Sequence, residues 1–249
     1  VALKRKDAPQ TEMIGSSSSF KALKSKLEKV TKSNGRVMLT GPAGVGKEVA
    51  ARYIHANSSR GEGPFVSVNS ASIEADRMEE VLFGRESEKG IEQGLMEQAH
   101  GGILYFDEVA DMPAGTQSKI LRVLVDQQFA RVGGSDKIKV DIRVISSTNK
   151  ILSHEIEAGR FREELFHRLN MVPVDVPSLE DRREDIPELA TYFIDGFNSD
   201  QGLPLREISG EAQALLQTMI WPGNVRQLKN VIERVLILGP DKGDIMTSE

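Results

Sequence analysis

The sequence contains no cysteine among its 249 residues, and only 5% of its residues are aromatic. The absence of cysteine excludes disulfide bonds and cysteine-ligated zinc, and it fits a reducing compartment. No apolar run reaches the roughly 18 residues of a membrane-spanning helix. The basic first ten residues lack the apolar segment of a signal peptide. We therefore expect a cytoplasmic protein with no membrane partner.

Basic charge is not in excess either, because the formal net charge is −5. A wholly basic surface that coats nucleic acid is therefore excluded. Hydrophobic residues make up 39% of the chain and charged residues 28%, as is typical of a globular protein with a core. The chain begins without a methionine, and we expect residues 1–13 to be a linker within a longer protein.

Short apolar segments alternate with amphipathic segments through the first two thirds of the chain. The apolar segments are typical of strands, at 36–40, 64–69, 102–107, 140–149 and 171–177. Helices are predicted at 20–30, 47–58, 76–83, 115–128, 151–159 and 161–170. This alternation predicts a five-stranded parallel sheet covered by helices on both faces.

After Pro177 the pattern changes, because no strand-like segment follows. Helices are predicted within 184–198, 209–219 and 223–238. We therefore expect an α/β nucleotide-binding subdomain at 14–177 and a small all-helical subdomain at 178–249.

Residues 41–47 read GPAGVGK, the glycine-rich form of a phosphate-binding loop, between a predicted strand and a predicted helix. Glycines let backbone N–H groups turn towards a phosphate, and the lysine reaches the outer phosphates. The alternative is a chance turn, which the strand–loop–helix context disfavours. The residues expected to bind nucleotide here are Gly41, Pro42, Ala43, Gly44, Val45, Gly46, Lys47, Glu48 and Val49. Glu48 stands where many such loops have a metal-binding serine or threonine, and its carboxylate can also hold Mg²⁺.

Asp107 and Glu108 end the third predicted strand, at the edge where parallel sheets bind ligands. We expect Asp107 to hold Mg²⁺ and Glu108 to activate the attacking water as a general base. By itself, such an acidic pair is more often a solvated strand end. Beside a phosphate loop, it predicts ATP hydrolysis.

Two asparagines also end strands. Asn149 is a candidate to orient the attacking water, and Asn69 is a candidate to bond Glu108 and hold it idle. For each, a turn or cap role is the alternative.

Arg162 and Arg168 lie six residues apart, so one helix face does not carry both. Each is either a solvated arginine or a donor of positive charge to the ATP of a neighbouring subunit. The residues by themselves leave these two interpretations open.

Taken together, these motifs resemble the AAA+ ATPase domain of bacterial enhancer-binding proteins, the activators of sigma-54 RNA polymerase. The resemblance runs from about residue 14 to about residue 238. It is carried by GPAGVGKEVAARYIH, GPFVSVNSASI, LMEQAHGGILYFDEVADMP, TQSKILRVL, DIRVISSTN, GRFREELFHRLN and WPGNVRQLKNVIERVLIL. A loop ending in Gly-Lys-Glu and the WPGNVR segment are specific to this family within AAA+ proteins.

The resemblance implies roles at matching positions. Thr148 and Asn149 are implied as the first sensor, and Arg226 as the second sensor, reaching from the helical lid to the phosphates. Ile14 and Gly15 are implied as part of the adenine pocket.

Three further positions also match the family. Asn69 is implied as the switch partner of the catalytic glutamate. Arg162 and Arg168 are implied as trans-acting arginines. They imply a ring of six or seven copies with shared ATP sites.

The resemblance fails at residues 85–94, which read RESEKGIEQG. Relatives carry a longer insertion here, with a Gly-Ala-Phe-Thr-Gly-Ala loop that contacts sigma-54. We expect a charged connector that is poorly suited to pressing into an apolar partner, because its acids would be desolvated. In lacking that loop, the sequence resembles some NtrX-type response regulators of two-component systems.

Two functions are therefore carried forward. The first is an ATP-hydrolysing regulator of transcription that does not remodel sigma-54 polymerase. The second is a nucleotide-gated oligomerisation module with little hydrolysis. A generic AAA+ unfoldase or clamp loader is disfavoured by the family-specific segments. Expected cofactors are ATP or ADP and Mg²⁺. Expected partners are further copies of this chain, RNA polymerase through an unknown sigma factor, and DNA through a domain outside this chain.

Overall fold

The computed structural model describes residues 12–203 and 206–239. The chain divides into two compact units. One unit contains Lys26–Thr40 and Ala50–Asp175. The other contains Gly41–Val49 together with the described parts of Val1–Ser25 and Val176–Glu249. Within the described residues, no helix is long and apolar enough to cross a membrane.

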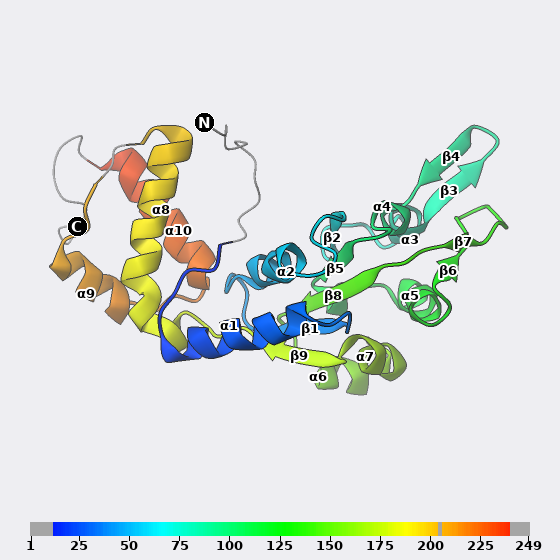
Figure 1. Ribbon diagram of the computed structural model, residues 1–249, viewed down its shortest axis with the longest axis horizontal. Helices are drawn as coiled ribbons and strands as arrows, with labels where there is room; N and C mark the ends of the chain where they lie inside the picture. Colours follow the sequence, from blue (N-terminus) through cyan, green and yellow to red (C-terminus); the bar gives the residue numbers. More distant parts are fainter. Residues whose placement is uncertain (1–11, 204–205, 240–249) are drawn as a thin grey trace. The chain divides into compact units, whose positions relative to one another are not determined.

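The first unit is built on a five-stranded parallel sheet in the order β2-β5-β8-β1-β9 (Figure 1). All five strands predicted from the sequence are present, and the predicted fold class is confirmed. Since parallel strands require crossovers, helices connect most successive strands. The strands are β1 (Val37–Thr40), β2 (Phe65–Asn69), β5 (Ile103–Asp107), β8 (Arg143–Thr148) and β9 (Val172–Asp175).

The predicted helices of this part of the chain are also present. Their bounds are α1 (Ser18–Thr31), α2 (Lys47–Ala56), α3 (Met78–Phe83), α5 (Ala114–Asp126), α6 (Leu152–Glu157) and α7 (Glu163–Leu169). A short helix α4 (Leu95–Gln98) and a 3-10 turn η1 (Val109–Asp111) were not predicted.

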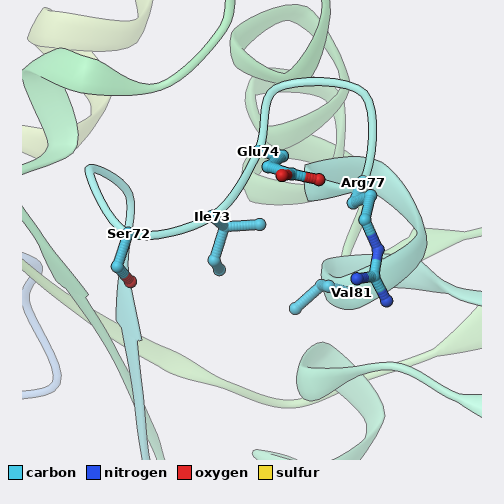
Figure 2. Close-up of a pocket in the computed structure, with 5 residues that line it drawn as sticks. All are labelled: Ser72, Ile73, Glu74, Arg77 and Val81. Carbon is cyan, nitrogen blue, oxygen red and sulfur yellow. The ribbon is translucent and has the colours of Figure 1, made fainter.

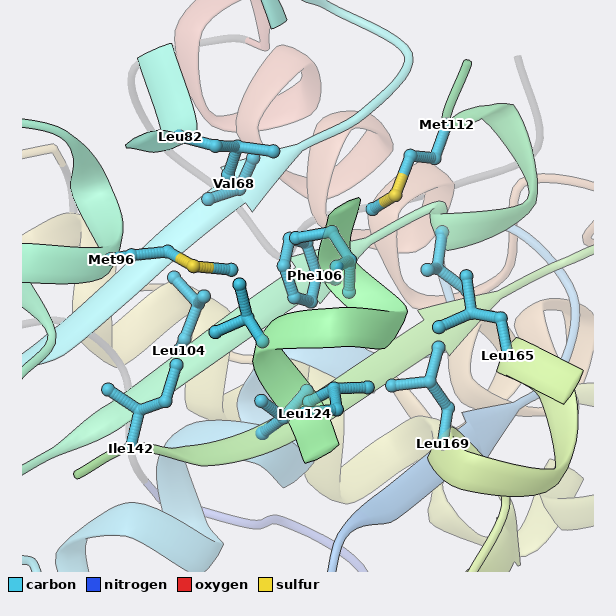
Figure 3. Packing of buried hydrophobic residues seen from close by; sticks show 14 of the residues in the cluster. Val68, Leu82, Met96, Leu104, Phe106, Met112, Leu124, Ile142, Leu165 and Leu169 are labelled. Atoms are coloured by element: carbon cyan, nitrogen blue, oxygen red, sulfur yellow. The ribbon is translucent and has the colours of Figure 1, made fainter. Parts of the chain in front are cut away.

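The core of this unit lies against the sheet, where buried strand residues meet apolar side chains of the helices (Figure 3). Leu104 and Phe106 of β5 are fully buried, as are Leu165 and Leu169 of α7. Each such side chain contributes about 1.5–3 kcal/mol by leaving water. The core therefore holds β5 rigidly, which fixes the position of the acidic residues at its end.

The segment predicted to be a charged connector is a β-hairpin instead. Strand β3 (Gly84–Ser87) pairs antiparallel with β4 (Gly90–Gln93) (Figure 1). The alternation of apolar and polar residues that predicts a strand is absent here, because Ile91 is the one apolar residue among the charged, polar and glycine residues of the segment. Gly84 has a φ of 75°, and a Cβ there would lie 2.3 Å from the Glu92 carbonyl oxygen. The edging glycine is thus required by the close approach of the two strands.

The hairpin is tied to a second, smaller one, formed by β6 (Gln128–Phe129) and β7 (Ile138–Lys139). The Glu86 amide donates to the Val132 carbonyl at 2.9 Å, and the Val132 amide donates to the Gly84 carbonyl at 3.0 Å. Arg131 forks onto Glu97 at 2.8 and 2.6 Å. Two-residue strands carry too little pattern to be predicted from the sequence.

The second unit is helical beyond Val176, as the sequence predicts. It contains η2 (Glu180–Asp185), α8 (Ile186–Gln201), α9 (Gly210–Thr218) and α10 (Asn224–Leu238). Ser209 caps α9 by accepting from the Ala212 amide at 3.2 Å. Trp221, the single tryptophan, is 1% exposed, and its indole N–H donates to the Leu216 carbonyl at 2.9 Å. Trp221 therefore pins α9 to the start of α10.

The division into units also bears on the phosphate loop. Its residues, Gly41–Val49, group with the helical lid rather than with the sheet that precedes them in sequence. The subdomain boundaries predicted at 13/14 and 177/178 stay predictions, and residues 1–11 of the predicted linker lie outside the described residues.

Candidate functional site

Polar residues line the carboxyl edge of the sheet because the strands are parallel and in register. Asn69 of β2 pairs with Asp107 of β5, and Thr148 of β8 pairs with Thr40 of β1. Thr40 also pairs with Asp175 of β9, at 3.1 Å between hydroxyl and carboxylate. The chain continues directly from Thr40 into the phosphate loop. Strand β5 lies beside β8, as expected for an AAA-like strand order.

Asp107 is held by two side chains that the sequence analysis missed. Ser147 donates to Asp107 Oδ1 at 2.6 Å, and the Tyr105 hydroxyl lies 3.1 Å from the same oxygen. Tyr105 and Ser147 are themselves 2.9 Å apart, and both are fully buried. Hydrogen bonds of this kind orient a carboxylate that ligates a metal. The available signal was the polar run SSTN at the end of the fourth predicted strand, together with a tyrosine two residues before the aspartate.

Magnesium fits the chemistry of this carboxylate. Mg²⁺ prefers oxygen ligands and is held by one or two carboxylates together with phosphate oxygens and water. Within the described part of the chain, no group of three or more His, Cys, Asp or Glu side chains could hold a metal by itself. The exposed Glu48, in the first turn of α2, is the other predicted ligand.

Glu108 adopts a left-handed backbone conformation, with φ 51° and ψ 52°. This conformation is uncommon for a residue with a Cβ, and such strain clusters at functional sites. The Glu108 carboxylate accepts the Asn149 amide at 3.0 Å. Two of the predicted catalytic residues are therefore in direct contact, through the Asn149 backbone rather than its side chain.

Asn69 was predicted to bond Glu108. In the structure the Asn69 amide group donates instead to Asp107 Oδ2 at 3.2 Å, and its carbonyl oxygen accepts the Ala71 amide at 3.0 Å. The physical reason is register, because Asn69 and Asp107 are cross-strand partners. A contact through Asp107 places Asn69 one residue away from the expected partner.

Arg162 and Arg168 are both exposed, and they occupy different ends of α7. Arg162 is the N-cap residue and lies before the helix, whereas Arg168 lies in its last turn. One arginine therefore projects from a helix end, as their spacing of six predicts.

A buried glutamine that the sequence analysis missed positions Arg162. Gln117 of α5 is fully buried, and its side chain accepts the Arg162 amide at 2.9 Å. It also donates to the Arg160 carbonyl at 2.9 Å. Arg160 in turn forks onto Glu155 at 2.7 and 2.9 Å, which lowers the pKa of the Glu155 carboxyl. These bonds fix the turn that presents Arg162.

The phosphate loop has the backbone of an anion cradle. Gly44 and Gly46 take φ values of 78° and 105°, in the region that glycine tolerates without a Cβ penalty. A Cβ on Gly46 would meet nothing within 4 Å. Alternating backbone handedness of this kind turns successive N–H groups to one side, where they bind anions.

Lys47 opens α2 at the end of the loop and is 6% exposed. Its ammonium donates to the carbonyl oxygens of Gly41 at 2.8 Å and Pro42 at 3.2 Å. A lysine folded onto its own loop in this way keeps its charge within the cradle.

The lid supports the loop directly. The Arg226 amide donates to the Gly44 carbonyl at 3.1 Å, whereas the Arg226 side chain, predicted to be the second sensor, is exposed. Arg182 and Asn224 also donate to loop carbonyls. Neither was a predicted site residue, since each is separated from the loop by well over 100 residues.

The predicted adenine segment is anchored by a buried carboxylate. Asp185 is fully buried and accepts the Ser16 amide at 2.8 Å, the Ser17 amide at 2.7 Å and the Ser17 hydroxyl at 2.7 Å. A Cβ on Gly15 would lie 2.7 Å from Asp185 Oδ2. Ile14 packs against the lid core. Gly15 is thus required for this close approach.

A separate pocket of about 360 Å³ lies beyond the turn that follows β2 (Figure 2). Figure 2 shows Glu74 and Arg77 on the same side of it, near Val81 of α3. It contains none of the predicted site residues.

Known protein families match most of the chain. Residues 13–175 match the family described as the sigma-54 interaction domain, and residues 180–249 match the AAA+ ATPase lid domain. The chain is 51% identical to the nitrogen assimilation regulatory protein NtrX of Azorhizobium caulinodans, covering 95% of this chain and 52% of that protein. It is 40% identical to the transcriptional regulator NtrC of Escherichia coli, covering 93% and 50%.

Solved structures of NtrX are also similar to this chain. NtrX from Brucella abortus in complex with ADP has a TM-score of 0.90 at 54% identity, covering 96% of this chain and 55% of that one. NtrX of the same organism in complex with ATP has a TM-score of 0.90 at 53% identity, covering 95% and 53%. The chain spans about half the length of these relatives.

Proposed function

The chain belongs to the family of sigma-54 interaction domains followed by an AAA+ lid, and from that premise we propose that it binds ATP with Mg²⁺ and hydrolyses it. The observation that carries the proposal is the phosphate loop, with positive φ at Gly44 and Gly46 and Lys47 folded onto it. The solved NtrX complexes with ADP and ATP support it.

In this proposal the loop amides and Lys47 bind the phosphates. Mg²⁺, when bound, supplies positive charge to the phosphate oxygens, with Asp107 and Glu48 as its protein ligands. Glu108 accepts a proton from the attacking water, and Asn149, held against it, orients that water together with Thr148. Arg226 reaches towards the phosphates from the lid, and Ile14 and Gly15 receive the adenine.

Asn69 acts on this machinery through Asp107. Its bond to Asp107 Oδ2 would compete with a metal for the same oxygen, so movement of Asn69 is coupled to metal binding. The predicted switch contact between Asn69 and Glu108 stays a prediction.

Arg162 and Arg168 supply charge to the site of a neighbouring copy. Their exposure at opposite ends of α7 supports this role, because a guanidinium that acts on another subunit has to be accessible. Shared sites imply a ring, of six or seven copies, as the active form.

The tests are two. ATPase activity per subunit is expected to rise with protein concentration and to be lost in Arg168→Ala. A flat, near-zero rate would favour the second candidate, a nucleotide-gated oligomerisation module with little hydrolysis. That candidate is favoured by one observation, the exposed charged hairpin described next.

The resemblance implies that the hairpin at Gly84–Gln93 stands where the family carries its sigma-54 contact loop. It holds Arg85, Glu86, Glu88, Lys89 and Glu92, and its exposed apolar residue is Ile91, at 60%. Pressing such a surface into an apolar partner would desolvate several charges. We therefore propose that this chain does not remodel sigma-54 polymerase. ATP-dependent open-complex formation at a sigma-54 promoter would refute this.

The parent protein is proposed to be a bacterial, cytoplasmic two-component response regulator of transcription. It would contact RNA polymerase through an unknown sigma factor and DNA through a domain outside this chain. The similarity to NtrX and NtrC supports this.

A further inference from the structure

We propose that Arg182 and Asn224 of the lid are positioning residues that hold the phosphate loop in its anion-binding form. The inference rests on the proposed function, and it names lid residues on which phosphate affinity depends. It concerns residues within one compact unit of the chain.

Three consecutive carbonyl oxygens of the loop are each held by the lid. The Asn224 side-chain amide donates to the Ala43 carbonyl at 2.9 Å, the Arg226 backbone amide to the Gly44 carbonyl at 3.1 Å, and Arg182 to the Val45 carbonyl at 3.2 Å. The lid thus grips every peptide group across the centre of the loop.

This grip determines where the loop amides point. In a trans peptide the C=O of one residue and the N–H of the next point in opposite directions. Holding the carbonyls of Ala43, Gly44 and Val45 towards the lid therefore directs the N–H groups of the three following residues, Gly44 to Gly46, away from the atoms that grip the loop. Those N–H groups are the ones that bind phosphate in a glycine-rich loop.

The loop at Gly44 packs closely against the lid backbone at Gly223. A Cβ on Gly44 would lie 2.2 Å from the Gly223 carbonyl oxygen, and Gly44 has a φ of 78°. The lid backbone at Gly223 and the loop are therefore in direct van der Waals contact, which the three hydrogen bonds lock in register.

Asn224 has properties that packing by itself does not require. It is 3% exposed, and its φ is 50°, a left-handed conformation that asparagine tolerates at some cost. Both ends of its side chain are used, because Oδ1 also accepts the Leu179 amide at 2.8 Å. Aspartate would lose the donor to the loop, and glycine would lose both bonds while keeping the backbone.

Burying the charged Arg182 costs more free energy than burying the neutral Asn224. It is 5% exposed, it interrupts η2 with φ −139° and ψ 44°, and its guanidinium lies 5.0 Å from the Phe20 ring centroid. Burial lowers the pKa of its guanidinium. Within the described residues, its Nε has no hydrogen-bond partner. The Nη2 of this buried cation donates to the Val45 carbonyl of the loop, and this bond offsets part of the cost of burying the charge.

Inorganic tripolyphosphate tests the inference because it carries the phosphates without the base. Its dissociation constant is measured by calorimetry for the 249-residue chain and for Asn224→Gly and Arg182→Met. We expect roughly fivefold weaker binding for Asn224→Gly and tenfold or more for Arg182→Met. For Asn224→Gly, the loss for ATP is expected to be the same factor, since the Asn224 side chain bonds Ala43 and Leu179 and not the predicted adenine segment.

Arg183→Met is the matched control. Arg183 is the next residue, and its guanidinium donates to lid carbonyls, at 2.7 Å to Gln217 and 3.0 Å to Met219, rather than to the loop. Tripolyphosphate affinity should stay within about twofold. Emission from Trp221, the single tryptophan, reports in every variant whether the lid is folded.

The outcomes distinguish failure of the proposed function from failure of the inference about Arg182 and Asn224. No binding of tripolyphosphate or ATP by the unaltered chain would overturn the proposed function and this inference together. Binding by the unaltered chain that both variants retain, or an equal loss in Arg183→Met, would overturn the inference and leave the proposed function standing. If Arg182→Met loses native Trp221 emission, Asn224→Gly decides.

Discussion

In the proposed function, the strand ends of the sheet and the phosphate loop both hold polar groups for the phosphates or their metal, but they position these groups by opposite means. At the strand ends the working groups are side chains, and the backbone ladder puts them in place. Asn69 faces Asp107 because β2 and β5 are in register. In the loop the working groups belong to the backbone, and side chains put them in place, through Arg182 and Asn224.

The difference has consequences for mutation. A strand-end residue is expected to lose one chemical role when it is changed, because its neighbours stay where the sheet holds them. Changing a residue that supports the loop, such as Arg182 or Asn224, is expected to weaken phosphate binding by several loop amides together. Each hydrogen bond to a loop carbonyl orients the backbone that carries these amides.

The sharpest contrast comes from Glu108→Gln, where we expect a fall in ATP turnover of about 1000-fold with ATP affinity changed less than about threefold. The carboxylate is lost as a base, while a similar group still accepts the Asn149 amide. Steady-state ATPase assays and calorimetry measure the two effects. Glu157→Gln, an exposed acid at the end of α6, serves as the control. Normal turnover in Glu108→Gln would remove Glu108 as the base.

Lys47→Ala is expected to weaken ATP binding by at least about 100-fold, since the phosphates lose the cation that the loop itself supplies. Lys29→Ala, an exposed lysine in the last turn of α1, should bind ATP as the unaltered chain does. Titration calorimetry distinguishes them. Equal affinities in the two variants would place the phosphates elsewhere.

Ser147→Ala tests whether the strand ends act one residue at a time. Removing the 2.6 Å bond to Asp107 should lower turnover roughly tenfold and raise the Mg²⁺ concentration needed for half-maximal activity. Tyr105→Phe should have a smaller effect of the same kind, and the double variant should lose less than the product of the two. Unchanged Mg²⁺ dependence would show that this network does not serve a metal.

The smallest expected effect concerns the ion pair of Arg60 and Asp141, which belong to neither region. Arg60 donates to Asp141 at 2.7 Å, which lowers the pKa of the Asp141 carboxyl. A lowered folded pKa gives stability that is present above the unfolded pKa of about 3.9 and is lost as the pH falls through the folded value. The Tm of the unaltered chain should exceed that of Asp141→Asn by about 1–3 °C at pH 6, and the gap should narrow as the pH falls below about 3.9. A gap that does not narrow as the pH falls below that value would contradict the assignment.

The sequence predicts the five strands and their helices because each buried strand is a continuous apolar run and each helix an amphipathic one. It also predicts the family, and the similarity to NtrX confirms that identification. It misses the hairpin at Gly84–Gln93, since a hairpin in which Ile91 is the one apolar residue has no apolar–polar alternation to detect.

The residues that support the site were missed for a different reason. Gln117, Asp185 and Asn224 are polar side chains buried by tertiary contacts, and nothing local distinguishes them from exposed ones. The contact of Asn69 with Asp107 was not foreseen, because it depends on the register between β2 and β5. Motifs locate the groups that touch a ligand, whereas their supports depend on the completed fold.

Calorimetric titration of the unaltered 249-residue chain with ATP, in the presence and absence of Mg²⁺, tests the central claim most directly. The account predicts saturable heat with one site per chain and tighter binding when Mg²⁺ is present. A titration without binding heat, with Trp221 emission showing a folded lid, would contradict it.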